Sequence, residues 1–243
     1  MGTAVMITSG KGGTGKTSLT AGVASCLAAL GRRVLCVDLD IGLRNLDLTL
    51  GMSDRALMDF TDVMDYRCPL LTAAVEQPEI RNLFLLTAPH TSPGLDQKRF
   101  QAVIEEAAEY FDYVFMDSPA GLGEGFQLAM SAADRVIVVS SVDPAALRDA
   151  QRTVAELHQL TQLHLVMNRV QPRLISKLRT SIDSAMDTAG LPLLGVVPED
   201  PSVTLATAAG VPLILATYKG AAPAYLNIAK RLLGQRVPLL RIR

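Results

Sequence analysis

Seven short apolar runs recur along this chain of 243 residues, and longer stretches with helical periodicity separate them. The runs are rich in β-branched residues, and several are apolar on both faces, as the strands of a buried parallel sheet must be. They fall at residues 4–8, 33–38, 83–88, 113–118, 135–141, 163–168 and 193–198. This alternation predicts an α/β fold, with a mostly parallel twisted sheet, helices on both faces and right-handed crossovers.

The stretches between these runs are expected to form helices. The expected helices cover residues 16–30, 97–110, 124–133, 144–160, 174–189, 201–209 and 221–233. Hydrophobic residues make up 49% of the chain, which is enough to bury a large core. We find no internal repeat and no linker long or polar enough to divide the chain, so we expect a single domain over residues 1–243.

The cysteines and the N-terminus indicate the cellular compartment. Cys26, Cys36 and Cys68 stand apart without a C-x-x-C pair, so neither a disulfide framework nor a zinc or iron–sulfur site is indicated. The opening "MGTAVMITSG" enters a strand pattern directly and lacks the basic and apolar regions of an export signal. No apolar run approaches the roughly 20 residues that a membrane-spanning helix needs. We therefore expect a cytoplasmic protein.

The segment "GKGGTGKT", residues 10–17, matches the phosphate-loop pattern G-x-x-x-x-G-K-[ST] between a predicted strand and a predicted helix. Its glycines let backbone N–H groups approach phosphate oxygens, and the helix N-terminus adds partial positive charge. Lys16 should reach the β- and γ-phosphates, and Thr17 should offer its hydroxyl to Mg²⁺. A glycine-rich turn alone would not explain this Lys-Thr pair. The predicted contacts with ATP or ADP are Gly10, Lys11, Gly12, Gly13, Thr14, Gly15, Lys16, Thr17 and Ser18.

Carboxylates follow two of the predicted strands, at the edge where α/β sheets bind ligands. Asp38 and Asp40 stand in "VDLDIGLRNLDL", where Gly42 allows a sharp turn, and two carboxylates there resemble a nucleotide-responsive switch. Asp117 ends an apolar strand in "MDSPAG", which is the Walker B arrangement. We expect Asp117 to hold a metal-bound water and the N–H of Gly121 to contact the γ-phosphate. A helix cap is the alternative reading of a single aspartate at a strand end.

Lys11 is a second lysine in a loop that needs only one. The pattern K-G-G-x-G-K-T resembles the deviant Walker A loop of the MinD/ParA family of P-loop ATPases, and "DIGLRNLDL" and "DSPAG" resemble its MinD branch. The resemblance extends along essentially the whole chain, including "AYLNIAKRLLG" at 224–234. In that family the extra lysine crosses a dimer interface to the partner's nucleotide. The resemblance therefore implies an ATP-dependent homodimer in which Lys11 acts like an arginine finger.

The resemblance also implies roles for individual side chains in catalysis and metal binding. Asp40 corresponds to the aspartate that orients the attacking water, and Asp38 is expected near the Mg²⁺ shell. The implied catalytic residues are Lys11, Lys16 and Asp40, and the implied metal ligands are Thr17, Asp38 and Asp117.

Two later loops correspond to those that hold adenine in the family. Asn168 closes the predicted strand in "VMNR", and Pro198, Glu199 and Asp200 stand in "GVVPEDPSV". The Asn168 amide can donate and accept a hydrogen bond at once, which suits the edge of adenine. An asparagine in an ordinary turn is the alternative.

Two segments depart from the family pattern. The segment "SVDPAALRDAQ", residues 141–151, lacks the Glu of the family's N-P-E-like segment, and Asp143 is its candidate substitute in contacts with the partner subunit. Proteins of the MinD branch associate peripherally with the membrane through a basic amphipathic helix at the C-terminus. Residues 235–243, "QRVPLLRIR", are too few and contain a proline, so we do not expect them to form it. Peripheral association with the inner face of the membrane by another means stays the alternative localisation.

The implied function is an ATPase switch that hydrolyses ATP slowly, dimerises with ATP and helps to position the division septum with a protein activator or effector. A DNA-binding partition ATPase of the ParA type is one alternative, and a flagellar-placement homologue is another. The DNA-binding alternative depends on the positive segment 201–243 and on a cluster of basic residues, which a solvated helix face would also explain. The cluster is Arg169, Arg173, Lys177 and Arg179. The family's reductase and iron–sulfur branches are disfavoured because no cysteine stands near the predicted switch after Asp117 or in a C-x-x-C pair.

Overall fold

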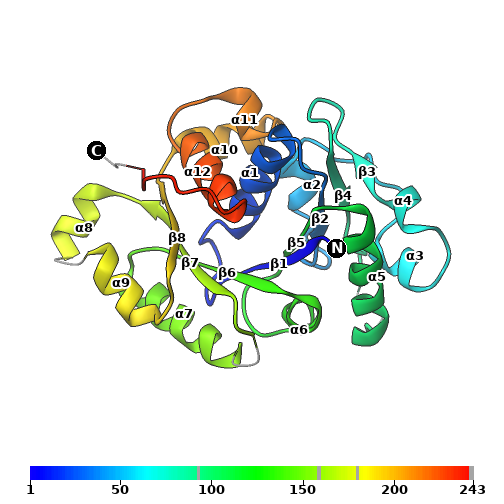
Figure 1. The fold of residues 1–243 in the computed structure, drawn as a ribbon, viewed down its shortest axis with the longest axis horizontal. Coiled ribbons are helices and arrows are strands. Elements are labelled where there is room, and N and C mark those ends of the chain that lie inside the picture. The colour runs from blue at the N-terminus through cyan, green and yellow to red at the C-terminus, as the bar shows by residue number, and fades with distance from the viewer. Residues whose placement is uncertain (92–93, 158–159, 179–180, 241–243) are drawn as a thin grey trace.

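A computed structural model describes residues 1–91, 94–157, 160–178 and 181–240. Within these residues eight strands form one sheet in the order β3-β4-β2-β5-β1-β6-β7-β8 (Figure 1). Neighbouring strands are parallel except at one edge, where the short β3 is antiparallel to β4. The strands are β1 (Thr3–Thr8), β2 (Val34–Asp38), β3 (Val75–Glu76), β4 (Leu83–Leu86), β5 (Tyr113–Asp117), β6 (Arg135–Ser140), β7 (Leu163–Val170) and β8 (Leu193–Pro198).

Helices cover both faces of this sheet (Figure 1). One face packs against α1 (Lys16–Ala29), α2 (Leu46–Thr49), α10 (Pro201–Ala208), α11 (Leu213–Ala216) and α12 (Ala222–Leu232). The other face packs against α3 (Phe60–Met64), α4 (Leu70–Ala73), α5 (Gln97–Tyr110), α6 (Glu124–Ala132), α7 (Pro144–Glu156) and α9 (Ile182–Ala189). The remaining helix, α8 (Pro172–Leu178), follows β7. None of the described helices is long and apolar enough to cross a membrane.

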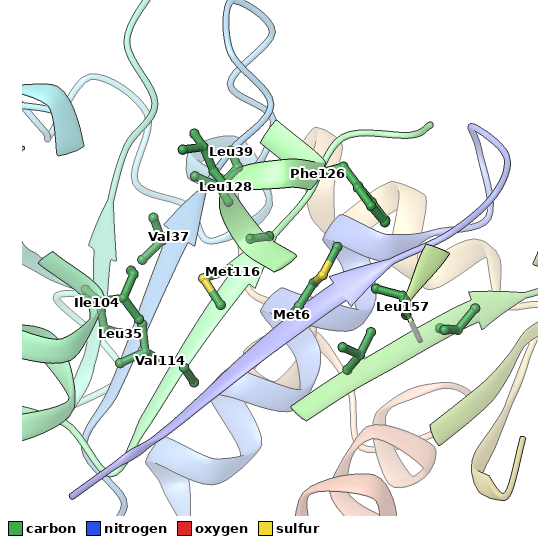
Figure 2. Packing of buried hydrophobic residues seen from close by; sticks show 14 of the residues in the cluster. Met6, Leu35, Val37, Leu39, Ile104, Val114, Met116, Phe126, Leu128 and Leu157 are labelled. Carbon is green, nitrogen blue, oxygen red and sulfur yellow. The ribbon is translucent and has the colours of Figure 1, made fainter. Parts of the chain in front are cut away.

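The central strands are buried on both sides. In β1, Val5 and Ile7 belong to the core on the α1 face, whereas Met6 belongs to the core on the opposite face. Figure 2 shows the second core, in which Met6 and Met116 lie among side chains from the neighbouring strands and helices, including Phe126 of α6. The apolar residues on both faces of these strands, which predicted a parallel sheet, thus fill two separate cores.

All seven predicted strands are confirmed, and the structure adds β3, whose two residues are too few to carry a periodic pattern. The prediction of one helix over 174–189 is wrong, because the described residues form two helices there. Ser181 accepts a hydrogen bond from the backbone N–H of Ser184 at 3.0 Å and thereby caps a new helix, α9. Of the predicted helix over 144–160, α7 ends at Glu156, and residues 158–159 lie outside the described residues.

The sheet order brings three predicted strand ends together. Strand β1 pairs with β5, and β5 pairs with β2, so that Asp117 is in register with both Ile7 and Asp38. The loop after β1 and the carboxylates after β2 and β5 therefore meet at one edge of the sheet, which is the edge where such folds bind ligands.

Candidate nucleotide-binding site

The backbone of the loop between β1 and α1 adopts a conformation that residues other than glycine rarely adopt. Gly13 and Gly15 adopt φ values of 76° and 87°, in the left-handed region that favours glycine. A Cβ on Gly15 would lie 2.4 Å from Nδ2 of Asn168, so the loop also approaches the end of β7 too closely for any side chain. The predicted phosphate loop thus has the open backbone that the binding of phosphate oxygens requires.

Lys16 begins α1 and buries its side chain in this loop. Its ammonium donates a hydrogen bond to Oγ of Ser9 at 3.0 Å. Burial lowers the pKa of Lys16, whereas the nearby carboxylates of Asp117 and Asp40 raise it. A buried ammonium that donates to one hydroxyl is well suited to bind an anion, because two of its three protons stay available to phosphate oxygens.

Asp117 lies buried at the end of β5 beside two hydroxyl groups of α1. Thr17 donates to its Oδ2 at 2.7 Å, and Thr20 donates to its Oδ1 at 2.9 Å. Burial raises the pKa of Asp117 to about 6, although these hydrogen bonds and Lys16 lower it.

The donor set around Asp117 fits Mg²⁺. A carboxylate beside a hydroxyl offers the oxygen ligands that Mg²⁺ prefers, and nucleotide phosphates normally complete such a site. Among the described residues no three His, Cys, Asp or Glu side chains converge to hold a metal. Thr17 and Asp117, whose side chains are hydrogen-bonded to each other, would hold Mg²⁺ together with a bound nucleotide.

Asp38 has a structural role that the sequence did not predict. Its carboxylate accepts hydrogen bonds from the backbone N–H groups of Asp40 at 2.9 Å and Leu46 at 3.1 Å. Burial and the nearby carboxylate of Asp117 raise the pKa of Asp38 to about 7, although these hydrogen bonds act to lower it. Asp38 thus closes the segment that carries Asp40, and its place near the Mg²⁺ shell stays a prediction.

Lys11, the other lysine of the loop, is exposed, whereas Lys16 is buried. Its ammonium is 3.6 Å from Oδ2 of Asp143, and the two side chains are 52% and 46% exposed. Asp143 also accepts a hydrogen bond from the N–H of Ala146 and caps α7. Because an exposed ion pair contributes about 0–1 kcal/mol, Lys11 can leave Asp143 at little cost.

The residues predicted to hold the base surround a cavity of about 120 Å³ next to the phosphate loop. Its walls include Gly15, Asn168, Pro198, Glu199, Asp200 and Tyr225. Asp200 caps α10 and accepts a second hydrogen bond, from the N–H of Ala221 at 2.8 Å, so its carboxylate shapes the wall of the cavity. Gly121 adopts a φ of 86° with open space around it, and its contact with a γ-phosphate stays a prediction.

Arg169 is a residue of the site that our sequence interpretation assigned elsewhere. Its guanidinium makes two hydrogen bonds to the carboxylate of Glu199, at 2.8 and 3.1 Å, and a third to the carbonyl oxygen of Gly13 at 2.9 Å. The positive charge of Arg169 is therefore paired with the carboxylate of Glu199, 30 residues away, so the proposed basic cluster has one unpaired charge fewer. Within that cluster Arg173 and Lys177 are exposed on α8, and Arg179 lies outside the described residues.

A phosphate loop with a buried lysine, a Thr–Asp pair suited to Mg²⁺ and an adjoining cavity at the carboxyl edge of a parallel sheet together define a P-loop nucleotide-binding protein. Residues 5–213 match the family described as the CobQ/CobB/MinD/ParA nucleotide binding domain. The chain belongs to this family.

Relatives and solved structures are similar over nearly the whole chain. The septum site-determining protein MinD of Bacillus subtilis (strain 168) is 39% identical over 98% of this chain and 92% of its own length. The MinC:MinD cell division protein complex of Aquifex aeolicus superposes with a TM-score of 0.91 at 35% identity, over 98% of both chains. MinD of Pyrococcus horikoshii OT3, complexed with Mg-ADP, gives a TM-score of 0.82 at 30% identity over 96% of both chains. These similarities assign the chain to the MinD branch of the family.

Proposed function

We propose that residues 1–243 form one ATPase domain that hydrolyses ATP slowly, dimerises when ATP is bound and helps to position the division septum. The observation on which the proposal depends is that the two lysines of the loop lie in different environments. Lys16 is buried next to Asp117, whereas Lys11 is half exposed on Asp143. The septum site-determining protein of Bacillus subtilis and the MinC:MinD complex of Aquifex aeolicus support division as the process and a MinC-like protein as a partner.

The residues of the site divide the chemistry between them. Lys16 and the backbone of the loop bind the β- and γ-phosphates, and Thr17 and Asp117 hold Mg²⁺, with Asp38 near it. Mg²⁺ held there would neutralise charge on the phosphates. Asp40 orients the attacking water, and Lys11 of the partner subunit neutralises the charge that develops in the transition state. The Mg-ADP complex of the Pyrococcus relative supports this choice of ligand and metal.

The variant Asp40→Ala tests whether ATP hydrolysis is needed for the ATP-bound dimer to dissociate. Orienting water matters to the chemical step and not to the ground state, so the variant should bind Mg-ATP but stay trapped as a dimer. Gel filtration coupled to light scattering measures the mass with ATP and with ADP. Asp47→Ala removes another acid from the same segment and should behave like the parent. A monomeric Asp40→Ala variant with normal turnover would remove Asp40 from the mechanism.

DNA binding of the ParA type is a second candidate, because Arg173 and Lys177 are exposed on one short helix. Phosphate contacts release counterions, so DNA binding should weaken steeply as salt increases. A filter-binding or anisotropy titration with duplex DNA at two salt concentrations would measure this. ATP-dependent affinity that falls steeply with salt and is lost in Arg173→Ala/Lys177→Ala would favour partition over septum placement.

A further inference from the structure

Two adjacent residues at the end of β7 hold the phosphate loop from outside. Asn168 donates from Nδ2 to the carbonyl oxygen of Thr14 at 2.8 Å, and Arg169 donates from Nη1 to the carbonyl oxygen of Gly13 at 2.9 Å. Arg169 does so with a φ of 55°, which is uncommon outside glycine and costs of the order of 1 kcal/mol or more. The pairing of β7 with β8 is irregular at this point, between Met167 and Val170. The chain thus departs from regular strand geometry where it reaches the loop.

These two bonds determine where the N–H groups of the loop point. In a trans peptide the C=O of one residue and the N–H of the next point in opposite directions, and none of the residues that the structure describes has a cis peptide bond. Holding the carbonyls of Gly13 and Thr14 therefore directs the N–H groups of Thr14 and Gly15 away from β7. Neither N–H has an acceptor among the described residues. They are free to bind the oxygens of a phosphate.

The other end of the Arg169 side chain is tied to the base cavity. Glu199 accepts two hydrogen bonds from the guanidinium, in the bidentate geometry that fixes orientation as well as distance. The backbone N–H of Glu199 donates to the carbonyl of Val170 at 3.1 Å, so Glu199 is itself held in place. The hydrogen bonds with Glu199 also raise the pKa of Arg169 above its ordinary value. Arg169 thus connects the loop that borders the cavity with the loop that would bind phosphate.

We propose that Arg169 is a positioning residue of the nucleotide site. Glu199 fixes the position of the Arg169 guanidinium, and the guanidinium in turn holds the carbonyl oxygen of Gly13 toward β7. The N–H of Thr14 therefore points toward the phosphate position before the nucleotide binds. Arg169 acts through the loop and does not contact the phosphates itself. This inference rests on the proposed function, because it assigns a role within the same ATP site.

The test compares three variants by calorimetry with two probes, Mg-ATP and Mg-tripolyphosphate. Arg169→Met removes the bonds and the charge. Arg169→Lys keeps the charge, but its single nitrogen cannot replace the planar guanidinium, which reaches Glu199 through Nε and Nη2 and Gly13 through Nη1. Arg173→Met removes an exposed positive charge from α8, the helix that follows β7, and leaves these bonds intact. We expect both Arg169 variants to bind both probes about tenfold more weakly, and Arg173→Met to bind like the parent.

Any other result of these binding measurements would contradict either the role of Arg169 or the proposed function. Parent-like affinity in Arg169→Lys would mean that only the charge matters and would overturn the inference. Weaker binding of ATP with unchanged binding of tripolyphosphate would mean that Arg169 contacts the base or the sugar, which also overturns it. A lower melting temperature with unchanged affinities would make Arg169 merely structural. If the parent binds neither probe, the proposed function fails and the inference fails with it.

Discussion

At the scale of single residues, burial separates groups that look alike in the sequence. Lys16 and Lys11 stand in the same loop, yet Lys16 is 9% exposed and next to Asp117, while Lys11 lies in solvent against Asp143. Electrostatic interactions are much stronger at a buried site than in water. The same substitution at the two lysines should therefore have different effects on ATP binding.

Lys16→Ala should abolish ATP binding. Removing one partner from a buried ionic contact costs about 3 kcal/mol or more, which corresponds to more than about a hundredfold in affinity. Calorimetry with Mg-ATP measures this, with Lys11→Ala as the control that should keep appreciable affinity in the monomer. If Lys16→Ala binds ATP as tightly as the parent, our interpretation of the loop is wrong.

Thr20→Val should lower the stability of the ligand-free protein. Thr20 is fully buried, and its hydroxyl bonds both to Asp117 and to the carbonyl of Lys16. Losing a hydrogen bond to a buried carboxylate costs about 2 kcal/mol, and each kcal/mol lowers the melting temperature of a chain of this size by roughly 2–4 °C. Thermal unfolding with Thr153→Val as the control tests this, because the buried Thr153 bonds to a helix carbonyl alone. Equal shifts in the two variants would show that Asp117 does not depend on Thr20.

At the scale of elements, the position of α1 depends on how closely α12 approaches it. A Cβ on Gly22 would lie 2.2 Å from Cδ2 of Tyr225, whose side chain is fully buried between the two helices and borders the base cavity. Glycine in a helix interior is unfavourable, so its presence in α1 is explained by this close approach. The helix that begins at the phosphate loop is thereby held against the C-terminal part of the chain.

Gly22→Ala should destabilise the protein although alanine is the better helix former. The gain in helix propensity is about 1 kcal/mol, whereas overpacking a buried ring typically costs 1–3 kcal/mol. We expect a net loss of about 1 kcal/mol in denaturant unfolding. The double variant Gly22→Ala/Tyr225→Leu should recover part of the loss that each change causes alone. Additive losses would show that the ring and the helix do not compete for the same space.

At the scale of the whole molecule, the proposed dimer makes each site depend on two chains. Lys11→Ala should lose dimerisation and hydrolysis, because the missing cation belongs to the partner's site. A mixture of Lys11→Ala with Asp40→Ala forms one composite site that lacks both residues and one that has both. We therefore expect ATPase activity to return on mixing, measured as phosphate release.

The control for this mixing experiment is the double variant Lys11→Ala/Asp40→Ala mixed with the parent. Native mass spectrometry should first show that heterodimers form in both mixtures. In the control every heterodimer site lacks either Lys11 or Asp40, so its heterodimers should be inactive if Lys11 acts in trans. Activity that requires Lys11 and Asp40 in one chain, despite demonstrated heterodimers, would show that Lys11 acts in cis.

The sequence alone was sufficient for the seven main strands, for the phosphate loop and for the aspartate at the end of β5. Each of these is a local signal, since hydrophobic periodicity and a contiguous motif depend on neighbouring residues. The same locality explains the errors. Two-residue β3 has no period to detect, and the pattern over 174–189 does not reveal that Ser181 caps a new helix.

The tertiary structure alone decided which distant groups meet. Arg169 bonds Gly13 and Glu199, and Thr20 bonds Asp117, across separations of 156, 30 and 97 residues. No local pattern carries such pairings, because they arise from the order of the strands in the sheet and from the irregular end of β7. The sequence therefore determined which chemical groups the site contains, and the packing of the sheet determined how they are held, because hydrogen bonds require positions that only the folded chain supplies.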